Sequence, residues 1–277
     1  MSSVVARALG LCGLLVVAAS ASAHAAGLSL PQAPGWLGVA MSTKAGIEPG
    51  IAVQHVVRNS PADKAGLHDA DRITKVDGAS VADAGEVTRV VARHAPGSSV
   101  AVTIVRSSKE LTLTATVAAR PTPTEMARLE FVGAYAPAWT KLVTVSGTMP
   151  ASVQALRGKV AVIEFWATWC GPCRLTQPTL ASWQAKYGAQ GLQVVGLTTD
   201  EAQLAADHAR KTGMSYPAAS DADATTSRAY GVTNLPTMFV VDRSGVVRDV
   251  IIGWEPGQEA RTEKLLQTLI AEPAPPP

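Results

Sequence analysis

The sequence contains the stretch Trp169-Cys170-Gly171-Pro172-Cys173, which follows an apolar run at residues 160–165 and precedes a helical pattern at residues 174–187. The apolar run predicts a buried strand, so the two cysteines lie where a strand passes into a helix. The first N–H groups of a helix have no intrahelical partner and form its positive dipole end, and both features favour a thiolate at Cys170. A cysteine pair in this setting predicts redox chemistry.

Composition and charge limit the classes of protein to which this chain can belong. The chain has 277 residues, of which 47% are hydrophobic and 17% charged, as is typical of a globular protein with one or two domains. A net charge of +2 and the lack of a basic run with interleaved aromatic residues argue against nucleic acid as a partner. The five histidines are scattered, so no metal site is predicted.

Residues 1–25 have the pattern of a cleaved signal peptide. A positive start at Arg7 is followed by an apolar stretch at residues 8–19 and by two Ala-x-Ala cleavage patterns at residues 21–25. One alternative is an uncleaved membrane anchor, for which the apolar run is short. Another is a lipoprotein signal around Cys12, against which Leu11 is a large residue where that signal has a small one. Cleavage would remove Cys12 and leave Cys170 and Cys173 as the only cysteines. We therefore expect a periplasmic or cell-envelope protein whose one cysteine pair is catalytic.

Residues 35–119 predict a small β-rich domain with two helices. Strand patterns occupy residues 36–41, 51–57, 71–76, 100–106 and 111–117, and helical patterns occupy residues 60–67 and 83–94. Asp77-Gly78 predicts a tight turn. We expect a stiff, polar linker over residues 120–130 because prolines alternate with threonines at residues 121–124.

Residues 131–271 predict an α/β domain. Further strand patterns lie at residues 192–197, 237–241 and 246–252, and helical patterns at residues 200–212, 223–230 and 258–270. This alternation predicts a central sheet flanked by helices. The proline-rich residues 272–277 predict a disordered tail.

The second domain resembles exported thioredoxin-like thiol–disulfide oxidoreductases of the TlpA/ResA type. The resemblance rests on residues 165–173, on Pro178 inside the helix, and on Asn234-Leu235-Pro236-Thr237. It implies a thioredoxin-like fold with a central mixed sheet. It also implies a protein that reduces disulfides of envelope proteins, for instance during cytochrome c maturation, and receives electrons from a membrane thiol-electron donor.

The first domain resembles PDZ domains of the bacterial type found in envelope stress proteases. Residues 36–39, 60–67, 71–73 and 76–78 carry this resemblance, and Ala70 departs from it where the family usually has glycine. It implies that the backbone N–H groups of Leu37, Gly38 and Val39 bind the carboxylate of a peptide, which adds as a strand. The partners that it implies are client proteins with disulfides or exposed C-termini, and the choice between free C-termini and internal segments stays open.

In the cysteine motif, Cys170 is the expected nucleophile, with its sulfur within reach of solvent. Cys173, one helical turn on and more buried, is expected to resolve the mixed disulfide. Gly171 allows close approach of a partner backbone, and Pro172 has no N–H to leave unpaired. The alternatives are a zinc half-site or a purely structural disulfide, and no cofactor is expected beyond the redox-active disulfide.

Four further residues complete the predicted site. The resemblance implies a cis bond between Leu235 and Pro236 that faces the dithiol and exposes the Leu235 backbone to substrate. Trp169 is expected at the surface beside Cys170. Glu164 interrupts an apolar strand, and a carboxyl group buried beneath the dithiol would have a raised pKa and would shuttle the proton of Cys173. The alternative for Glu164 is a pairing with a neighbour or contact with solvent.

We therefore predict an exported protein-disulfide reductase whose PDZ-like domain recruits clients. A disulfide oxidase or isomerase is the first alternative, because the same chemistry runs in either direction. A PDZ-based adaptor with a redox-sensing site is the second. The oligomeric state stays open.

Overall fold

The computed structural model describes residues 33–42 and 49–273. The expected signal segment lies outside the described residues, as do residues 274–277 of the expected tail. Within the described ranges, no helix is both long and apolar enough to span a bilayer.

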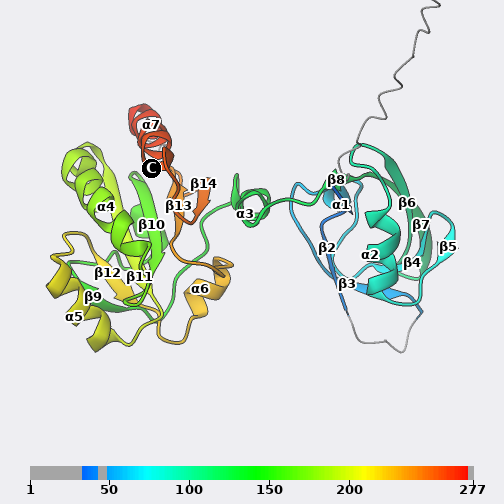
Figure 1. The fold of residues 1–277 in the computed structure, drawn as a ribbon, viewed down its shortest axis with the longest axis horizontal. Coiled ribbons are helices and arrows are strands. Elements are labelled where there is room, and N and C mark those ends of the chain that lie inside the picture. The colour runs from blue at the N-terminus through cyan, green and yellow to red at the C-terminus, as the bar shows by residue number, and fades with distance from the viewer. Residues whose placement is uncertain (1–32, 43–48, 274–277) are drawn as a thin grey trace, which may run out of the picture. The chain divides into compact units, whose positions relative to one another are not determined.

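The N-terminal domain contains a two-stranded sheet, β1-β8, and a larger sheet in the order β2-β3-β4-β6-β7, with β5 paired to β4 (Figure 1). Its elements are β1 (Gly35–Trp36), β2 (Val39–Met41), β3 (Ile51–Val56), α1 (Pro61–Lys64), β4 (Arg72–Val76), β5 (Ala79–Ser80), α2 (Ala84–Ala92), β6 (Ser99–Arg106), β7 (Lys109–Thr116) and β8 (Ala118–Ala119). The expected turn at Asp77-Gly78 joins β4 to β5, and both residues have positive φ, as a tight hairpin turn requires.

The strand expected over residues 36–41 is wrong, because the chain leaves one sheet and joins another within it. β1 ends at Trp36 and β2 begins at Val39. Between them Gly38 has φ +87°, a left-handed conformation that glycine adopts without strain. The interruption places Leu37 and Gly38 in an irregular loop beside β2.

The linker expected over residues 120–130 is mostly helical. Helix α3 spans Pro123–Phe131 and begins with a capping box, in which Thr122 and Glu125 each bond the other's backbone N–H. Arg128 forms an ion pair with Asp249 of β14 at 2.7 Å, and the ring of Phe131 packs edge-on against Phe239. Helix α3 therefore packs on the C-terminal domain as part of it.

The C-terminal domain has one mixed six-stranded sheet in the order β14-β13-β10-β11-β12-β9 (Figure 1). Strands β10, β11 and β12 run parallel, and β13, β14 and β9 are antiparallel to their neighbours. Its elements after α3 are β9 (Val143–Ser146), a 3-10 turn (Val153–Leu156), β10 (Val160–Trp166), α4 (Cys173–Tyr187), a second 3-10 turn (Gly188–Gln190), β11 (Leu192–Thr198), α5 (Ala202–Thr212), β12 (Ala218–Ser220), α6 (Thr225–Ala229), β13 (Thr237–Val241), β14 (Val247–Ile252) and α7 (Gln258–Ala271).

Strand β10 is buried on both faces, and its alternating side chains enter two separate cores. Ala161, Ile163 and Phe165 pack in one core with Phe239 and, at its edge, Phe131 of α3. The alternate residues Val160 and Val162 pack in the other core with Leu180 of α4 and Leu266 of α7. Glu164 has the parity of the second set, so its side chain lies on the α4 side of the sheet.

Candidate active site

Cys170 and Cys173 form a disulfide at the start of α4. Cys173 is the first residue of the helix, and its backbone N–H lies 3.2 Å from the Cys170 sulfur. This N–H is one of those that the helix cannot pair internally. Once the disulfide opens, the same N–H and the helix dipole stabilise negative charge on Cys170 more than on Cys173.

The expectation that the Cys170–Cys173 pair is within reach of solvent is wrong for the oxidised form, although Cys173 is the more buried of the two, as expected. Cys173 is fully buried, as expected, but Cys170 is only 3% exposed in this oxidised form. The cause is that Cys170 turns inward to bond Cys173 and packs with Trp166 and Ala205. The exposed surface belongs instead to its sequence neighbours at positions 169, 171 and 172.

The Leu235–Pro236 peptide bond is cis, as the resemblance implied. Leu235 packs against the buried cluster that contains both cysteines. A cavity of about 340 Å³ opens beside this loop, between Leu235 and Trp169, with Leu197 and Arg228 also in its wall. Trp169 is 73% exposed, as expected for a side chain that receives substrate.

Trp166, by contrast, is 1% exposed and belongs to the core.

Glu164 is completely buried and accepts hydrogen bonds from two hydroxyl groups. Thr176 of α4 lies 2.6 Å from one carboxyl oxygen, and Tyr216, from the loop before β12, lies 2.9 Å from the other. Burial raises the pKa of Glu164 to about 7, although both hydroxyl groups oppose the rise. The alternative in which Glu164 reaches solvent is therefore wrong, and its neighbours in the site are neutral donors.

Thr176 suits both protonation states of Glu164. Its single hydroxyl hydrogen has two acceptors in range, the Glu164 carboxyl oxygen and the Cys173 carbonyl oxygen at 2.8 Å. When Glu164 is ionised, the hydroxyl donates to the carboxylate. When Glu164 is protonated, the carboxyl donates to Thr176 and the hydroxyl turns to Cys173. A proton can thus be gained or lost without leaving a buried polar atom unpaired.

The residues that hold the loop before Cys170 were not predicted from the sequence. The backbone N–H of Thr168 donates to the Asp200 carboxylate at 2.6 Å, and its carbonyl accepts from Arg174 at 3.4 Å. Thr176 also went unnoticed, although its spacing of three residues from Cys173 places it on the same helix face. Asp200 and Tyr216 follow β11 and precede β12, and no local pattern marks either one.

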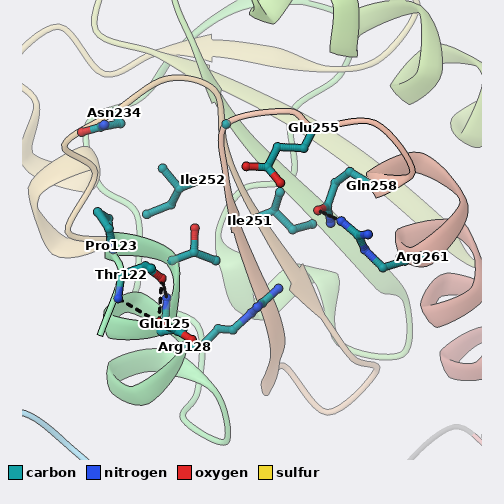
Figure 2. Close-up of a pocket in the computed structure, with 12 residues that line it drawn as sticks. Thr122, Pro123, Glu125, Arg128, Asn234, Ile251, Ile252, Glu255, Gln258 and Arg261 are labelled. Atoms are coloured by element: carbon teal, nitrogen blue, oxygen red, sulfur yellow. Dashed lines mark hydrogen bonds between the residues drawn. The ribbon is translucent and has the colours of Figure 1, made fainter. Parts of the chain in front are cut away.

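A second cavity, of about 590 Å³, lies between the starts of α3 and α7 and strand β14 (Figure 2). Most of its charged side chains already have partners. Glu125 caps α3, Arg128 pairs with Asp249, and Arg261 donates to Gln258. The cavity beside Trp169 is therefore the better candidate for contact with a client of the cysteine pair.

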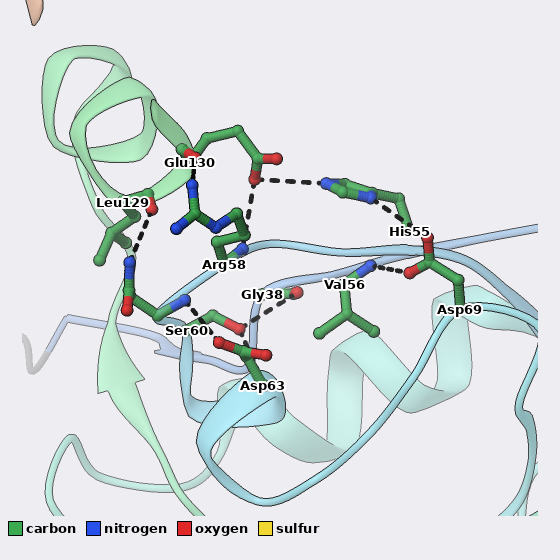
Figure 3. A network of polar contacts seen from close by, with 10 residues as sticks. Gly38, His55, Val56, Arg58, Ser60, Asp63, Asp69, Leu129 and Glu130 are labelled. Carbon is green, nitrogen blue, oxygen red and sulfur yellow. Dashed lines mark hydrogen bonds and ion pairs between the residues drawn. The ribbon is translucent and has the colours of Figure 1, made fainter. Parts of the chain in front are cut away.

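The loop at Leu37 and Gly38 forms a separate candidate site in the N-terminal domain. The Leu37 carbonyl accepts from Ala62 N–H and the Gly38 carbonyl from Val57 N–H, each at 2.9 Å, and the Ser60 hydroxyl also reaches the Gly38 carbonyl (Figure 3). These carbonyls point into the domain. Because C=O and N–H point in opposite directions across a trans peptide, the N–H groups of Gly38 and Val39 point away from it.

Those N–H groups are available to a ligand. Within residues 33–42 and 49–273, nothing accepts a hydrogen bond from the N–H of Leu37 or Gly38, although both residues are buried. Unpaired N–H groups of buried residues are rare unless a ligand or water satisfies them. Val39 is paired with Val56 of β3, and the nearest hydrogen bond between the two strands runs from the Val57 N–H to the Gly38 carbonyl. The N–H and C=O of Val39 itself therefore point away from β3, toward the unpaired edge of β2.

Comparison with known families agrees with this architecture. The Redoxin family model matches residues 131–266, and the PDZ domain model matches residues 35–117. The chain therefore contains a PDZ domain, matched over residues 35–117, followed by a redoxin domain with a thioredoxin-like fold, matched over residues 131–266.

Individual relatives match the redoxin part. The chain is 35% identical over 99 residues to the thiol-disulfide oxidoreductase ResA of Bacillus thuringiensis (strain Al Hakam), covering 35% of this chain and 57% of that protein. It is 33% identical over 99 residues to ResA of Bacillus subtilis (strain 168), covering 35% of this chain and 55% of that protein. The match thus spans little more than half the length of these relatives.

Among solved structures, a thiol:disulfide interchange protein of the thioredoxin family from Chlorobium tepidum TLS matches with 28% identity and a TM-score of 0.43. The match covers 55% of this chain and 100% of that chain.

Proposed function

We propose that the protein is a thiol–disulfide oxidoreductase of the cell envelope that reduces disulfides in client proteins. The observation that carries the proposal is the Cys170–Cys173 disulfide at the start of α4, with the Cys173 N–H directed at the Cys170 sulfur. The similarity to ResA over the redoxin part supports the same chemistry.

The proposed reaction has two steps. In the reduced protein, the Cys170 thiolate attacks a client disulfide, forming a mixed disulfide while the client's second sulfur leaves as a thiolate and takes a proton. The Cys173 thiolate then attacks the Cys170 sulfur. This closes the internal disulfide and releases the client's first sulfur, so two electrons pass to the client. A thiol donor at the membrane returns them.

Glu164 is the proposed acceptor of the Cys173 proton in the second step. A base with a pKa of about 7 is effective near neutral pH, and Thr176 contacts both Glu164 and the Cys173 backbone. Replacing Glu164 with glutamine should abolish the rise of the reduction rate with pH near neutrality. An unchanged pH profile would remove this role.

Reduction of insulin disulfides by the pre-reduced protein tests the function. Cys170→Ser should reduce the rate to background, whereas Cys173→Ser should accumulate a mixed disulfide at Cys170 that mass spectrometry detects. If the wild-type protein shows only the background rate, the reductase function is ruled out. The potential of the pair measured against glutathione tests the direction, because a strongly oxidising couple would favour an oxidase or isomerase.

We also propose that the PDZ domain recruits clients by binding a chain terminus at Leu37, Gly38 and Val39, where the outward N–H groups fit a carboxylate. Gly38→Ala tests this, because the added Cβ would lie 2.3 Å from Ser60 Cβ at a φ of +87°. Reduction of a protein client should slow, and reduction of a small disulfide should not. Gly97→Ala is the matched control, with φ +91° and nothing within 4 Å of the added atom.

Export by a cleaved signal peptide at residues 1–25 is part of the same proposal, and it rests on the sequence pattern. Comparing the mass of the mature protein from envelope fractions with that of the full chain tests the cleavage. Recovery of the uncleaved chain alone would contradict it.

A further inference from the structure

Strand β7 forms an open edge of the PDZ-domain sheet. It is the last strand in the order β2-β3-β4-β6-β7 and runs for 8 residues, Lys109–Thr116, most of them exposed. Its pairing with β6 has no bulge, the strand contains no proline, and its two charged residues stand together at one end. Bulges, prolines and charges are the usual protections of an edge strand, because an unprotected edge pairs readily with another strand.

The turn before β7 fixes the direction of its backbone hydrogen bonds. Ser107 and Ser108 form a two-residue turn with positive φ at both positions, so Arg106 and Lys109 on either side of it form a hydrogen-bonded pair. Every second residue after Lys109 bonds β6 in the same way. The residues between them direct their N–H and C=O groups outward, and they are Glu110, Thr112, Thr114 and Thr116. Within residues 33–42 and 49–273, these outward groups have no hydrogen-bond partner.

We propose that the protein forms a homodimer in which β7 pairs with β7 of a second copy, antiparallel and about a two-fold axis at Thr112. The proposal goes beyond the redox function and does not depend on it. In this register Thr112 lies opposite Thr112 of the partner subunit, and Glu110 lies opposite Thr114 of the partner subunit. The outward groups of the two strands then bond each other. One surface serves both copies, as a closed two-fold interface requires.

Two leucines favour this register. Leu113 packs at the edge of the PDZ-domain core, whereas Leu111, on the same face of β7, is 39% exposed. With the axis at Thr112, Leu111 lies opposite Leu113 of the partner subunit in a pair without hydrogen bonds, where side chains of neighbouring strands come closest. Pairing therefore covers an exposed apolar side chain in each copy.

The same register brings opposite charges together. Lys64 of α1 lines a cavity with Thr114, and in the part of the chain that the structure describes it has no ion-pair partner. Glu110 is exposed and forms an ion pair with Lys75 at 3.2 Å. Opposite Thr114 of the partner subunit, the Glu110 carboxylate approaches Lys64 of the partner subunit without leaving Lys75. Each copy therefore complements a charge of the other.

Pairing at β7 leaves the client-binding edge of the PDZ domain free. β2, whose open edge is the proposed site of strand addition, lies at the other end of the same sheet order. A dimer presents two such edges. A client assembly with two chain ends would then be held more strongly than by a single copy.

Sedimentation velocity of the full chain tests the proposal, with the Cys170–Cys173 pair oxidised and any free thiol alkylated so that no disulfide links two copies. The wild-type protein should sediment as a dimer that dissociates on dilution. Thr112→Pro should raise the dissociation constant at least about tenfold, because the ring removes an outward N–H in both copies and leaves the bonds to β6 intact. Thr112→Val is the matched control. It too loses the hydroxyl that contacts Thr103 at 3.1 Å, but it keeps the N–H and should stay dimeric.

A charge swap tests the register. Glu110→Lys and Lys64→Glu alone should each raise the dissociation constant about tenfold, because each places like charges together at two symmetric positions. The double variant should return to the wild-type value. Loss of the pair between Glu110 and Lys75 inside one copy cannot produce this recovery, because the double variant loses that pair as well.

A wild-type protein that stays monomeric at every concentration would overturn the proposal, and so would a dimer that Thr112→Pro leaves intact. Circular dichroism shows whether each variant folds. If Thr112→Pro does not fold, the charge swap decides alone, and a double variant no tighter than the single ones would refute pairing through β7 in this register. Insulin reduction by each variant measures the redox function separately and should not change per chain.

Discussion

Replacing Glu164 with glutamine should stabilise the redoxin domain, and the gain should grow as the pH rises. Glutamine keeps the size of the side chain and can still bond the hydroxyl groups of Thr176 and Tyr216, but it never ionises. The wild-type carboxyl must ionise in a fully buried position. The difference between the two proteins therefore isolates the cost of that charge.

The magnitude follows from the pKa of Glu164, which burial raises from 4.5 to about 7. The unfolded chain releases this proton near the lower value and the folded chain near the higher one. The native state therefore binds the proton more tightly, and stability falls as the pH rises through this window. At about 1.4 kcal/mol per pKa unit, the full loss is about 3 kcal/mol, and most of it falls between about pH 5 and about pH 9.

Urea unfolding followed by tryptophan fluorescence measures this difference. Five of the six tryptophans lie beyond residue 131, so the signal reports mainly on the redoxin domain. The stability of Glu164→Gln relative to wild type should increase by about 2 to 3 kcal/mol between about pH 5 and about pH 9. Glu259→Gln, an exposed glutamate of the same domain, should show no such trend.

A relative stability that does not change with pH would refute the reasoning. It would show that Glu164 titrates as an ordinary carboxyl group. The proposed proton transfer from Cys173 would then lose its physical basis, because a base ionised well below neutral pH is a weak acceptor there.

Three further substitutions test separate parts of the structure. Tyr216→Phe removes a donor to the Glu164 carboxylate, so the pH profile of insulin reduction should move upward, by up to about one pH unit. Asp71→Ala leaves Arg106 without the carboxylate that it contacts twice at 2.7 Å, and urea unfolding should show a loss of about 2 kcal/mol in the PDZ domain, less than for a fully buried pair because Arg106 is partly exposed. Trp169→Ala should raise the KM for protein clients and leave the free energy of unfolding unchanged within about 0.5 kcal/mol, because this side chain is 73% exposed. An unchanged KM would exclude Trp169 from client binding.

The parts of the fold that the sequence predicted are those with strong local signals. The expected strand at 160–165 and the helix from 174 differ from β10 and α4 by one residue each, because a continuous apolar run and a cysteine-proline turn mark their ends. The strand at 237–241 and the turn at Asp77-Gly78 were also predicted correctly. In each case neighbouring residues alone determine the structure.

The sequence-based predictions were wrong or incomplete where the structure is determined by contacts between distant residues or by helix caps that were overlooked. Helix α3 was taken for a linker because its prolines suggested a stiff coil, although Thr122 and Glu125 have the spacing of a capping box and Pro123 suits a first turn. β9 and β12 are short strands that were not expected, and they pair with each other at the edge of the sheet. Tyr216 reaches Glu164 across 52 positions of sequence, which no local pattern encodes.

The positions of the two cysteines indicate how the proposed redox cycle would use them. Cys170 lies between the exposed residues Trp169 and Gly171, whereas Cys173 is fully buried, so the proposal expects a donor thiolate to attack the Cys170 sulfur and expel Cys173. A thiolate at Cys173 would lack solvent, and the proposal assigns its proton to the protonated form of Glu164, which shares the Thr176 hydroxyl with the Cys173 carbonyl. In the opposite half-reaction the same carboxylate takes the proton back. In the proposed cycle Cys170 is the sulfur that meets each partner, and the buried carboxyl with a pKa of about 7 would let the proton move in either direction near neutral pH.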